Sequence, residues 1–431
     1  MSMPKKKSGM KIGIAETTLN VPLFAELYGY GPFLGRRNRG TRDPLYCRVM
    51  SFTDGRRRNM IVVTDGVVTD DGEARALRTK IAKEFETEPD GIMFAATHTH
   101  SGPAMSSGIG WGEKSEEYLR HWRRTVIATV RKALQSEEEV TAFAGIAPLS
   151  RKLGVNRVNP KRPTDPSIRW IQFKRKNGTV KALLHNHGMH GVVFGRTLLV
   201  SADWMGEANR LIKSRKLADT PFFLYGAAGN INTEPCCKQE TEGEELLKRI
   251  GKSYVDDLEK SLKAGGKEIS LHPLQNALER VRMPTVEEDS AQMRENAETV
   301  RKINPFLADR FEEMAILHDR GKRFPVRLDL QVLRMGDVAV YAFPGEPFVE
   351  LGRRIMEESA FPFAMPVGVA NGNGRYFPTP ETFDMFPDGL ATRKASYGFY
   401  EIYQGAGRFM PRYDRNIADF IVTRLLNLNL K

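Results

Sequence analysis

The chain has no apolar run long enough to cross a membrane. None of its hydrophobic stretches reaches the roughly 18 residues that a spanning helix needs. Residues 1–9 include three lysines, and no apolar stretch follows them. We therefore interpret residues 1–9 as a basic, flexible N-terminus and not as a secretory signal. Both absences favour a cytoplasmic protein without a membrane span.

Cysteine is also scarce. The three cysteines are Cys47, Cys236 and Cys237, an odd number that gives no disulfide framework. Cys236 and Cys237 are neighbours in the chain and are poorly placed to bond each other. A reducing compartment is the expectation from this pattern as well.

The sequence lacks a basic element interleaved with aromatic residues, which is typical of nucleic-acid binding. The net charge is +12, and part of it lies in "GRRNRGTRD" (35–43) and "DGRRRN" (54–59). These runs are scattered, so they indicate solvated surfaces with at most a weak attraction for acidic substrates. We expect no nucleic-acid partner, and no pattern indicates an oligomeric state.

Internal repeats and Pro/Gly/Ser-rich linkers are missing too, which favours one large domain over residues 10–431. Apolar spacing predicts a strand ending at Asp65, a helix in "DGEARALRTKIAKEFE" and a strand in "DGIMFAATHTH". A hairpin is expected around "MGD" (335–337). Residues 238–325 are expected to form a largely helical insertion over one face. The predicted fold class is α/β, with mixed β-sheets and flanking helices.

Histidines cluster at two strand ends. His98 and His100 follow one apolar strand, and His185, His187 and His190 lie at the end of another. Residues two apart in a strand share a face, so His98 and His100 can both point into one cleft. Neutral imidazole suits zinc, but such histidines can also be polar residues that end a strand.

An acidic residue follows a third strand. Glu346, in "YAFPGEPFVELG", comes after a Pro-Gly turn and can be a metal ligand or a carboxylate at the start of a helix. Two further strands run into small and polar residues, in "LYGAAGNINTEP" (224–235) and "VGVANGNGRYFPTPETF" (367–383). Together these strand ends predict one shared cleft. No phosphate-binding loop is present, and Ser101 lacks the glycines of a nucleophile elbow.

Taken together, these motifs resemble the neutral/alkaline non-lysosomal ceramidase family, specifically its N-terminal catalytic domain. The resemblance rests on "THTHSGP", "GVNRVNP", "MHGVVFG", "GAAGNINTEP", "FPGEPFVELG" and "ANGNGRYFPTPE", which occur in order. "IGIAETTLNVPL" and "IVVTDGVV" agree near the N-terminus. The similarity extends from about residue 10 to about residue 405.

The resemblance implies a zinc-dependent amidohydrolase with a defined set of site residues. The implied zinc ligands are His98, His190, Glu346 and Tyr376, with His187 as the alternative to His190. The implied catalytic residues are His100, Arg157 and Tyr400. Zn2+ would be the cofactor, and water would complete its coordination. For Asp203 there are two hypotheses, an acid that orients a ligand histidine and a helix N-cap.

Three departures from the family pattern bear on the substrate. Secreted ceramidases carry a secretion signal and a further C-terminal β-sandwich, and neither is expected in this sequence. Asn230 also stands where the family has an aspartate. We therefore expect cleavage of a carboxamide bond in a small soluble N-acyl amine. The alternatives are an ester or sugar-derived substrate, or a non-catalytic binding protein on the same scaffold.

Overall fold

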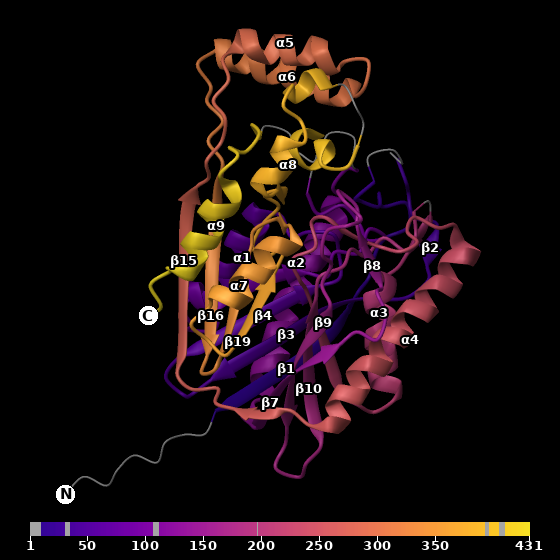
Figure 1. Ribbon diagram of the computed structural model, residues 1–431. Helices are drawn as coiled ribbons and strands as arrows, with labels where there is room; N and C mark the ends of the chain where they lie inside the picture. The colour runs from indigo at the N-terminus through magenta and orange to yellow at the C-terminus, as the bar shows by residue number, and fades with distance from the viewer. Residues whose placement is uncertain (1–9, 31–34, 107–111, 196, 393–395, 405–409) are drawn as a thin grey trace, which may run out of the picture.

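Three β-sheets form the body of the computed structural model, which describes residues 10–30, 35–106, 112–195, 197–392, 396–404 and 410–431 (Figure 1). The expected basic N-terminus, residues 1–9, lies outside the described residues. The first sheet has the order β5-β4-β3-β1-β6, the second β12-β10-β9-β7-β14 and the third β15-β16-β17-β19. Each sheet contains one parallel pair, β4/β5, β10/β12 or β17/β19, among antiparallel neighbours. The predicted α/β class with mixed sheets is confirmed.

The strands have the following bounds. The first sheet contains β1 (Lys11–Leu19), β3 (Leu45–Thr53), β4 (Arg58–Thr64), β5 (Ile92–Ala96) and β6 (Glu138–Glu139). The second contains β7 (Thr141–Pro148), β9 (Ser167–Lys174), β10 (Val180–His187), β12 (Thr220–Tyr225) and β14 (Lys267–Ile269). The third contains β15 (Leu274–Arg282), β16 (Arg327–Met335), β17 (Val338–Ala342) and β19 (Phe363–Val367). Short pairs join β2 (Gly40–Thr41) to β11 (Leu199–Val200), β8 (Gly154–Asn156) to β13 (Ile231–Thr233), and β18 (Glu346–Pro347) to β20 (Tyr376–Phe377).

Strand alternation places a common core between the three sheets. In β4, Ile61 and Val63 face this central core, whereas Met60 and Val62 face a second core on the outer side of the sheet. The same alternation holds in β10, β12 and β17. Because both faces of these strands are buried, they read as continuous apolar runs in the sequence.

Helices cover the outer face of each sheet. The first sheet packs against α1 (Asp71–Glu84) and α2 (Glu116–Gln135), the second against α3 (Asp203–Ser214) and α4 (Glu240–Ala264), and the third against α7 (Val349–Glu358) and α9 (Ile417–Leu426). The helix predicted after Asp65 is α1, which begins where the Asp70 side chain accepts hydrogen bonds from two backbone N–H groups. The hairpin predicted around "MGD" joins β16 to β17, and Gly336 provides its positive φ of 56°.

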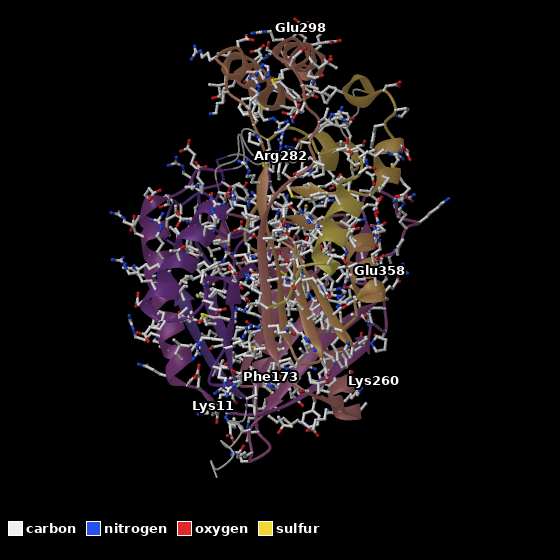
Figure 2. The ribbon with its side chains drawn as sticks, turned by 90° about the vertical axis from the view of Figure 1, so that its left-hand side faces the viewer. Lys11, Phe173, Lys260, Arg282, Glu298 and Glu358 are labelled. Atoms are coloured by element: carbon white, nitrogen blue, oxygen red, sulfur yellow. The ribbon has the colours of Figure 1, made fainter. Side chains whose placement is uncertain are left out.

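A helical pair projects beyond the body. Helices α5 (Ser290–Val300) and α6 (Pro305–Asp319) lie at the top of Figure 1, above the short helix α8 (Pro380–Asp384). Figure 2 shows the same projection from the side, with Glu298 near its end and Arg282 where it leaves the sheet. Short helical turns also occur at Pro89–Gly91, Gly389–Thr392 and Tyr400–Gln404.

The expected insertion over residues 238–325 is corrected by the sheets. Helix α4 packs on α3 and covers the second sheet, so it belongs to the body. Strand β14 pairs with β7, and β15 pairs with β16. Only the part between β15 and β16 leaves the body. The charged pattern of α4 does not distinguish an insertion from a helix of the body, because a helix that covers a sheet is also charged on its solvent face.

None of the helices in the described part of the chain is both long enough and apolar enough to cross a bilayer.

Candidate metal centre

The carboxyl ends of strands from all three sheets meet at one place. His98 follows β5, His190 follows β10, and Glu346 follows β17. The loops are joined by backbone contacts: Thr99 pairs with Gly191 in a parallel bridge, and β18 pairs with β20. The strand ends that the sequence predicted to share one site are thus brought together, although they are distant in the chain.

Three buried histidines gather there. The ring nitrogens that His98, His100 and His190 can offer to a metal all lie within 4.8 Å of one another. Nε2 of His100 is 3.3 Å from Nε2 of His98. His98 has a left-handed backbone with φ of 66°, which is uncommon for a residue with a side chain and is found often at functional sites.

Glu346 completes a tight set of donor atoms. Its Oε2 lies 3.0 Å from Nε2 of His190 and 3.3 Å from Nε2 of His98. Despite these short separations, Oε2 of Glu346 and Nε2 of His190 are buried without a hydrogen-bond partner. Two buried polar atoms this close without a hydrogen bond are costly unless something else satisfies both.

The hydrogen bonds at Nδ1 of His98 and of His190 explain this geometry. Nδ1 of His98 lies 2.7 Å from the carbonyl oxygen of Val67, and Nδ1 of His190 lies 3.0 Å from that of Ile231. A carbonyl accepts only, so each neutral ring carries its proton on Nδ1 and leaves a lone pair on Nε2. Those lone pairs point toward the lone pairs of a carboxylate. A cation between them satisfies all three atoms, and two nitrogens and one oxygen suit a divalent transition metal such as zinc.

Charge in the cluster agrees with this arrangement. Burial, followed by the nearby Arg157, lowers the pKa of His190 to about 4, so the ring is neutral at physiological pH. Burial alone would raise the pKa of Glu346, but His98 and His190 hold it well below its usual value. A neutral imidazole and an ionised carboxylate are the forms that bind a metal.

Tyr376 lies beside Glu346. The two residues are directly opposite each other in the β18/β20 pair, and the backbone N–H of Glu346 donates to the carbonyl of Arg375 at 2.7 Å. Burial raises the pKa of Tyr376, so its hydroxyl is protonated. The ring of Tyr400 packs edge-on against the ring of Tyr376, with centroids 5.6 Å apart.

Arg157 is held from two sides and has one free donor. Its Nε donates to Oε1 of Glu401 at 2.8 Å, and its Nη1 donates to Oδ1 of Asn232 at 3.1 Å. Its Nη2 is buried without a hydrogen-bond partner. The guanidinium carbon lies 5.2 Å from the ring centre of Tyr376 and 5.9 Å from that of Tyr400. Such a fixed group can present one N–H donor to a bound molecule.

His100 lies between His98 and the N-terminal loop that contains Tyr30. Its Nδ1 is buried without a hydrogen-bond partner, and the ring of Tyr30 packs on it at 5.0 Å between centroids. Burial, and then His98 and His190, lower the pKa of His100 well below its ordinary value. The geometry allows His100 either to join the ligand set or to face a substrate.

Gly29 makes room for His100, and replacing it by alanine is expected to reduce activity. A Cβ on Gly29 would lie 2.6 Å from Nδ1 of His100, and the φ of Gly29 is 113°. Displacing a site residue by about 1 Å costs activity on the order of a hundredfold. The steady-state rate of the folded variant measures this loss.

Gly178→Ala is the matched control, because Gly178 also has a positive φ, of 84°, but a Cβ there meets nothing within 4 Å. Both variants share the backbone strain, and only Gly29→Ala is expected to lose activity. Equal activity in the two variants would contradict this role of Gly29.

His187, the alternative ligand, points away from the cluster. In β10, Leu183, His185 and His187 share the face that packs against α3 and α4. Nδ1 of His187 lies 3.0 Å from the carbonyl oxygen of Ser167. Among the described residues, the group of three that can hold a metal contains His190 and not His187. His190 reaches the site because it lies beyond the end of the strand.

His185 has a structural role that predicts acid sensitivity. It contacts the hydroxyl of Tyr254 and Oδ1 of Asn209, both at 2.9 Å. Burial lowers its pKa from 6.5 to about 4. Between these values the unfolded chain binds a proton and the folded chain does not, so this stability is complete above pH 6.5 and is lost as the pH falls toward 4. The loss from His185 is about 3 kcal/mol.

Urea unfolding of wild type and His185→Gln at neutral and acid pH tests this prediction. Glutamine can keep one acceptor and one donor but does not titrate, so the variant should lose less stability in acid. The same loss in both proteins would show that His185 does not carry the effect.

Asp203 and Asn230 support the loops behind the site. Asp203 accepts hydrogen bonds from the backbone of Val193 and Trp204, so it does not orient a ligand histidine, and Ala202 is the N-cap of α3. Backbone carbonyls take the orienting role instead. Asn230 accepts from the N–H of Val349 and donates to Glu350, both at 2.9 Å. An aspartate at this position would repel Glu350, so the amide suits the start of α7.

Sequence reasoning missed several site residues. Glu401 pairs with Arg157, and Tyr225 places its hydroxyl 3.2 Å from Nδ1 of His190. Tyr225 ends β12, so its place at a strand end was a usable signal. Gly29 and Glu401 carried no local signal, because only the folded chain brings them to the cleft.

The fold has counterparts among solved structures. The crystal structure of neutral ceramidase from Pseudomonas aeruginosa is similar over 98% of this chain and 74% of that chain, with 17% sequence identity and a TM-score of 0.76. A structure of ceramidase complexed with C2 is similar over 97% of this chain and 74% of that chain, with 16% identity and a TM-score of 0.76. No protein-family model and no curated protein sequence matches the chain. The chain therefore has the fold of neutral ceramidase, with a buried group of three histidines where its strand ends meet.

Proposed function

We propose that the protein is a zinc-dependent hydrolase that cleaves the carboxamide bond of an N-acyl amine. The observation that carries this proposal is the convergence of His98, His190 and Glu346, in which Nε2 of His190 and Oε2 of Glu346 are buried and lack hydrogen-bond partners. The likeness of the fold to neutral ceramidase structures supports amide chemistry. The small-molecule amide is the only partner proposed, and the three free cysteines are consistent with the cytoplasm as its location.

Four residues would hold the metal. His98 and His190 offer Nε2, Glu346 offers Oε2, and Tyr376 is opposite Glu346 in the adjoining strand. Zn2+ bound there would supply Lewis acidity toward the amide carbonyl and activate a water molecule. The carbonyl partners of His98 and His190 would keep both rings in the required tautomer.

Arg157 and Tyr400 would stabilise the carbonyl oxygen of the substrate. The free Nη2 of Arg157 is buried and is held in place through Glu401 and Asn232. It can donate a hydrogen bond that stabilises the negative charge developing on that oxygen. Tyr400 packs on Tyr376 and near Arg157, so its hydroxyl is a second proposed donor. Donors held in place before reaction cost little reorganisation when charge develops.

His100 would move the proton that amide cleavage requires. Its neutral ring can take a proton from the attacking water as the carbon–oxygen bond forms. It can then deliver that proton to the nitrogen as the carbon–nitrogen bond breaks. The products are a carboxylic acid and an amine.

A substrate panel tests the proposal. N-acyl amines of short and long acyl chain would be compared with the matching esters and with glycosides, using purified wild type and Glu346→Gln. The proposal expects release of amine by wild type and a much slower release by the variant. Turnover of esters or glycosides but of no amide would favour the alternative hydrolase. No turnover of any substrate by the metal-loaded protein would favour a binding protein.

A further inference from the structure

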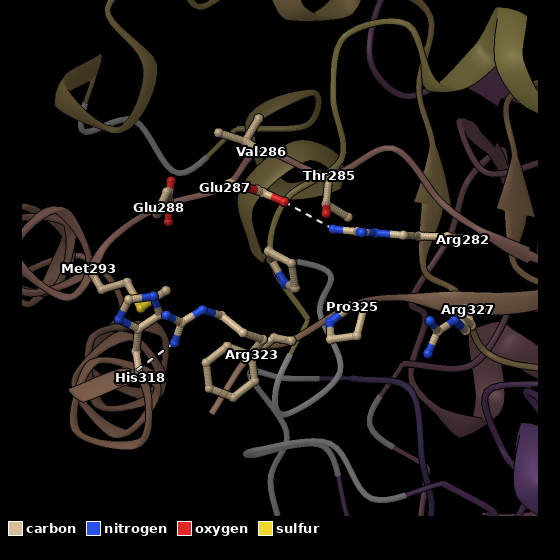
Figure 3. A pocket seen from close by; sticks show the side chains of 12 residues that line it. Arg282, Thr285, Val286, Glu287, Glu288, Met293, His318, Arg323, Pro325 and Arg327 are labelled. Carbon is tan, nitrogen blue, oxygen red and sulfur yellow. Dashed lines mark hydrogen bonds and ion pairs between the residues drawn. The ribbon is translucent and has the colours of Figure 1, made fainter. Parts of the chain in front are cut away.

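A cavity lies where the projecting helical pair meets the body, and none of its lining residues belongs to the candidate metal centre. It has a volume of about 370 Å³ and is lined by the ends of β15 and β16, by helices α5 and α6 and by Pro411 (Figure 3). Arg282 and Arg327 enter it from opposite positions on the two strands. Arg323 enters from the segment after α6, and Phe324 and Met293 give it apolar surface.

The acidic side chains of this cavity are already paired. Glu287 accepts a hydrogen bond from Arg282 at 3.0 Å, which Figure 3 shows as a dashed line. Glu288 lies 3.7 Å from the guanidinium of Arg412, outside the lining. Two arginines of the lining are left without an acid. Among the described residues, the side chain of Arg323 donates only to the carbonyl oxygens of His318 and Lys322, and the side chain of Arg327 has no hydrogen-bond or ion-pair partner.

Two buried arginines behind the lining add more positive charge. Arg310 and Arg375 are only 5% and 4% exposed. Arg310 donates to the carbonyl of Tyr403, and Arg375 donates to the carbonyls of Met410 and Pro411. Neither forms an ion pair with a described carboxylate, and Nε of each is buried without a hydrogen-bond partner. Burial, and then the nearby Arg375, lower the pKa of Arg310 to about 9.

This arrangement is electrostatically unfavourable as it stands. A buried guanidinium loses its hydration, and carbonyl contacts replace it only in part. Pro411 connects the buried arginines to the cavity. Its carbonyl accepts a hydrogen bond from Arg375, and the residue also lines the cavity. An anion in the cavity could accept hydrogen bonds from the guanidinium groups of Arg323 and Arg327. Its negative charge would also offset the positive charge of the buried Arg310 and Arg375.

We propose that this cavity binds a phosphate group, either as inorganic phosphate or as a phosphomonoester. Arginine forks match the spacing of phosphate oxygens, and an excess of positive charge favours a dianion over a monoanion. The apolar surface of Phe324 and Met293 fits an organic group attached to the phosphate. The proposal is separate from the hydrolase proposal, because none of the residues that line the cavity belongs to the candidate metal centre.

Calorimetric titration of the metal-loaded protein with inorganic phosphate, phenyl phosphate and benzoate tests the proposal. We expect saturable binding of both phosphates and weaker binding of benzoate. The variant Arg323→Gln/Arg327→Gln should weaken phosphate binding by at least about tenfold, since two charge-assisted hydrogen bonds are lost. Arg301→Gln is the matched control: Arg301 is also an exposed arginine of the helical pair, but it pairs with Asp309 and Glu312 and does not line the cavity.

Two further measurements distinguish the kind of phosphate that binds and the site at which it binds. Sedimentation with phosphatidylcholine vesicles, with and without phosphatidic acid, shows whether a lipid phosphate can also bind through Arg323 and Arg327. The His98→Ala variant tests whether phosphate binds at the strand-end site instead. The proposal is overturned if neither phosphate binds saturably, if Arg301→Gln weakens binding as much as the double variant does, or if only His98→Ala abolishes binding. Circular dichroism of each variant confirms that it is folded.

Discussion

Replacing Glu346 by glutamine is expected to remove the bound metal and to abolish hydrolysis while leaving the protein folded. The amide oxygen is neutral, so it no longer balances the charge of a cation held beside His98 and His190. Changing residues that merely orient a ligand costs about 10- to 100-fold in metal affinity or activity, and loss of the ligand itself should cost more. Metal content and the rate of amine release, measured on the same preparation, check this prediction.

Glu350→Gln is the control for that variant. Glu350 is four residues further along, in α7, and among the described residues its side chain contacts Asn230 and Arg162 but no histidine. The same chemical change there should leave both metal content and rate close to wild type. If Glu346→Gln retains metal and full activity, Glu346 is not a ligand.

Arg157→Ala is expected to be the most damaging single substitution outside the ligand set. It leaves the carboxylate of Glu401 buried without its partner, which costs about 3–5 kcal/mol of folding free energy. It also removes the free Nη2 donor, and loss of one such donor reduces the rate by about 100- to 1,000-fold. Denaturant unfolding gives the first quantity, and the rate per folded molecule gives the second.

Another buried pair separates these two effects. Arg169 and Asp165 form an ion pair in which both side chains are 6% exposed, compared with 7% and 0% for Arg157 and Glu401. Arg169→Ala should therefore destabilise the protein to a similar extent but spare the rate of the folded fraction. Equal rates for the two variants would show that the role of Arg157 is purely structural.

Strand patterns were sufficient to predict that His98 and Glu346 lie near each other, because both follow the ends of apolar runs. Strands β4 and β5 are visible in the sequence as apolar runs, and the segments that lead into His98 and Glu346 carry small and polar residues. The choice between His187 and His190 could not be made from spacing. It depends on where β10 ends, since His187 is still in the strand and faces α3 and α4.

Contacts between distant segments were beyond reach of the sequence. The fit of His100 against Gly29 and the pairing of Arg157 with Glu401 each join parts of the chain that are far apart. The extent of the projecting helical part was also misjudged, because β14 and β15 are short or charged enough to resemble parts of an insertion. The family resemblance identified Tyr376 and Tyr400, and the structure brings their rings together without testing their roles.

The most direct test of metal-dependent amide hydrolysis is amine release from an N-acyl substrate by one preparation before chelation, after chelation and after added Zn2+. We expect turnover at the start, loss of turnover once the metal is removed, and recovery when zinc is restored. Full activity in protein shown by elemental analysis to contain no metal would rule out metal-dependent hydrolysis.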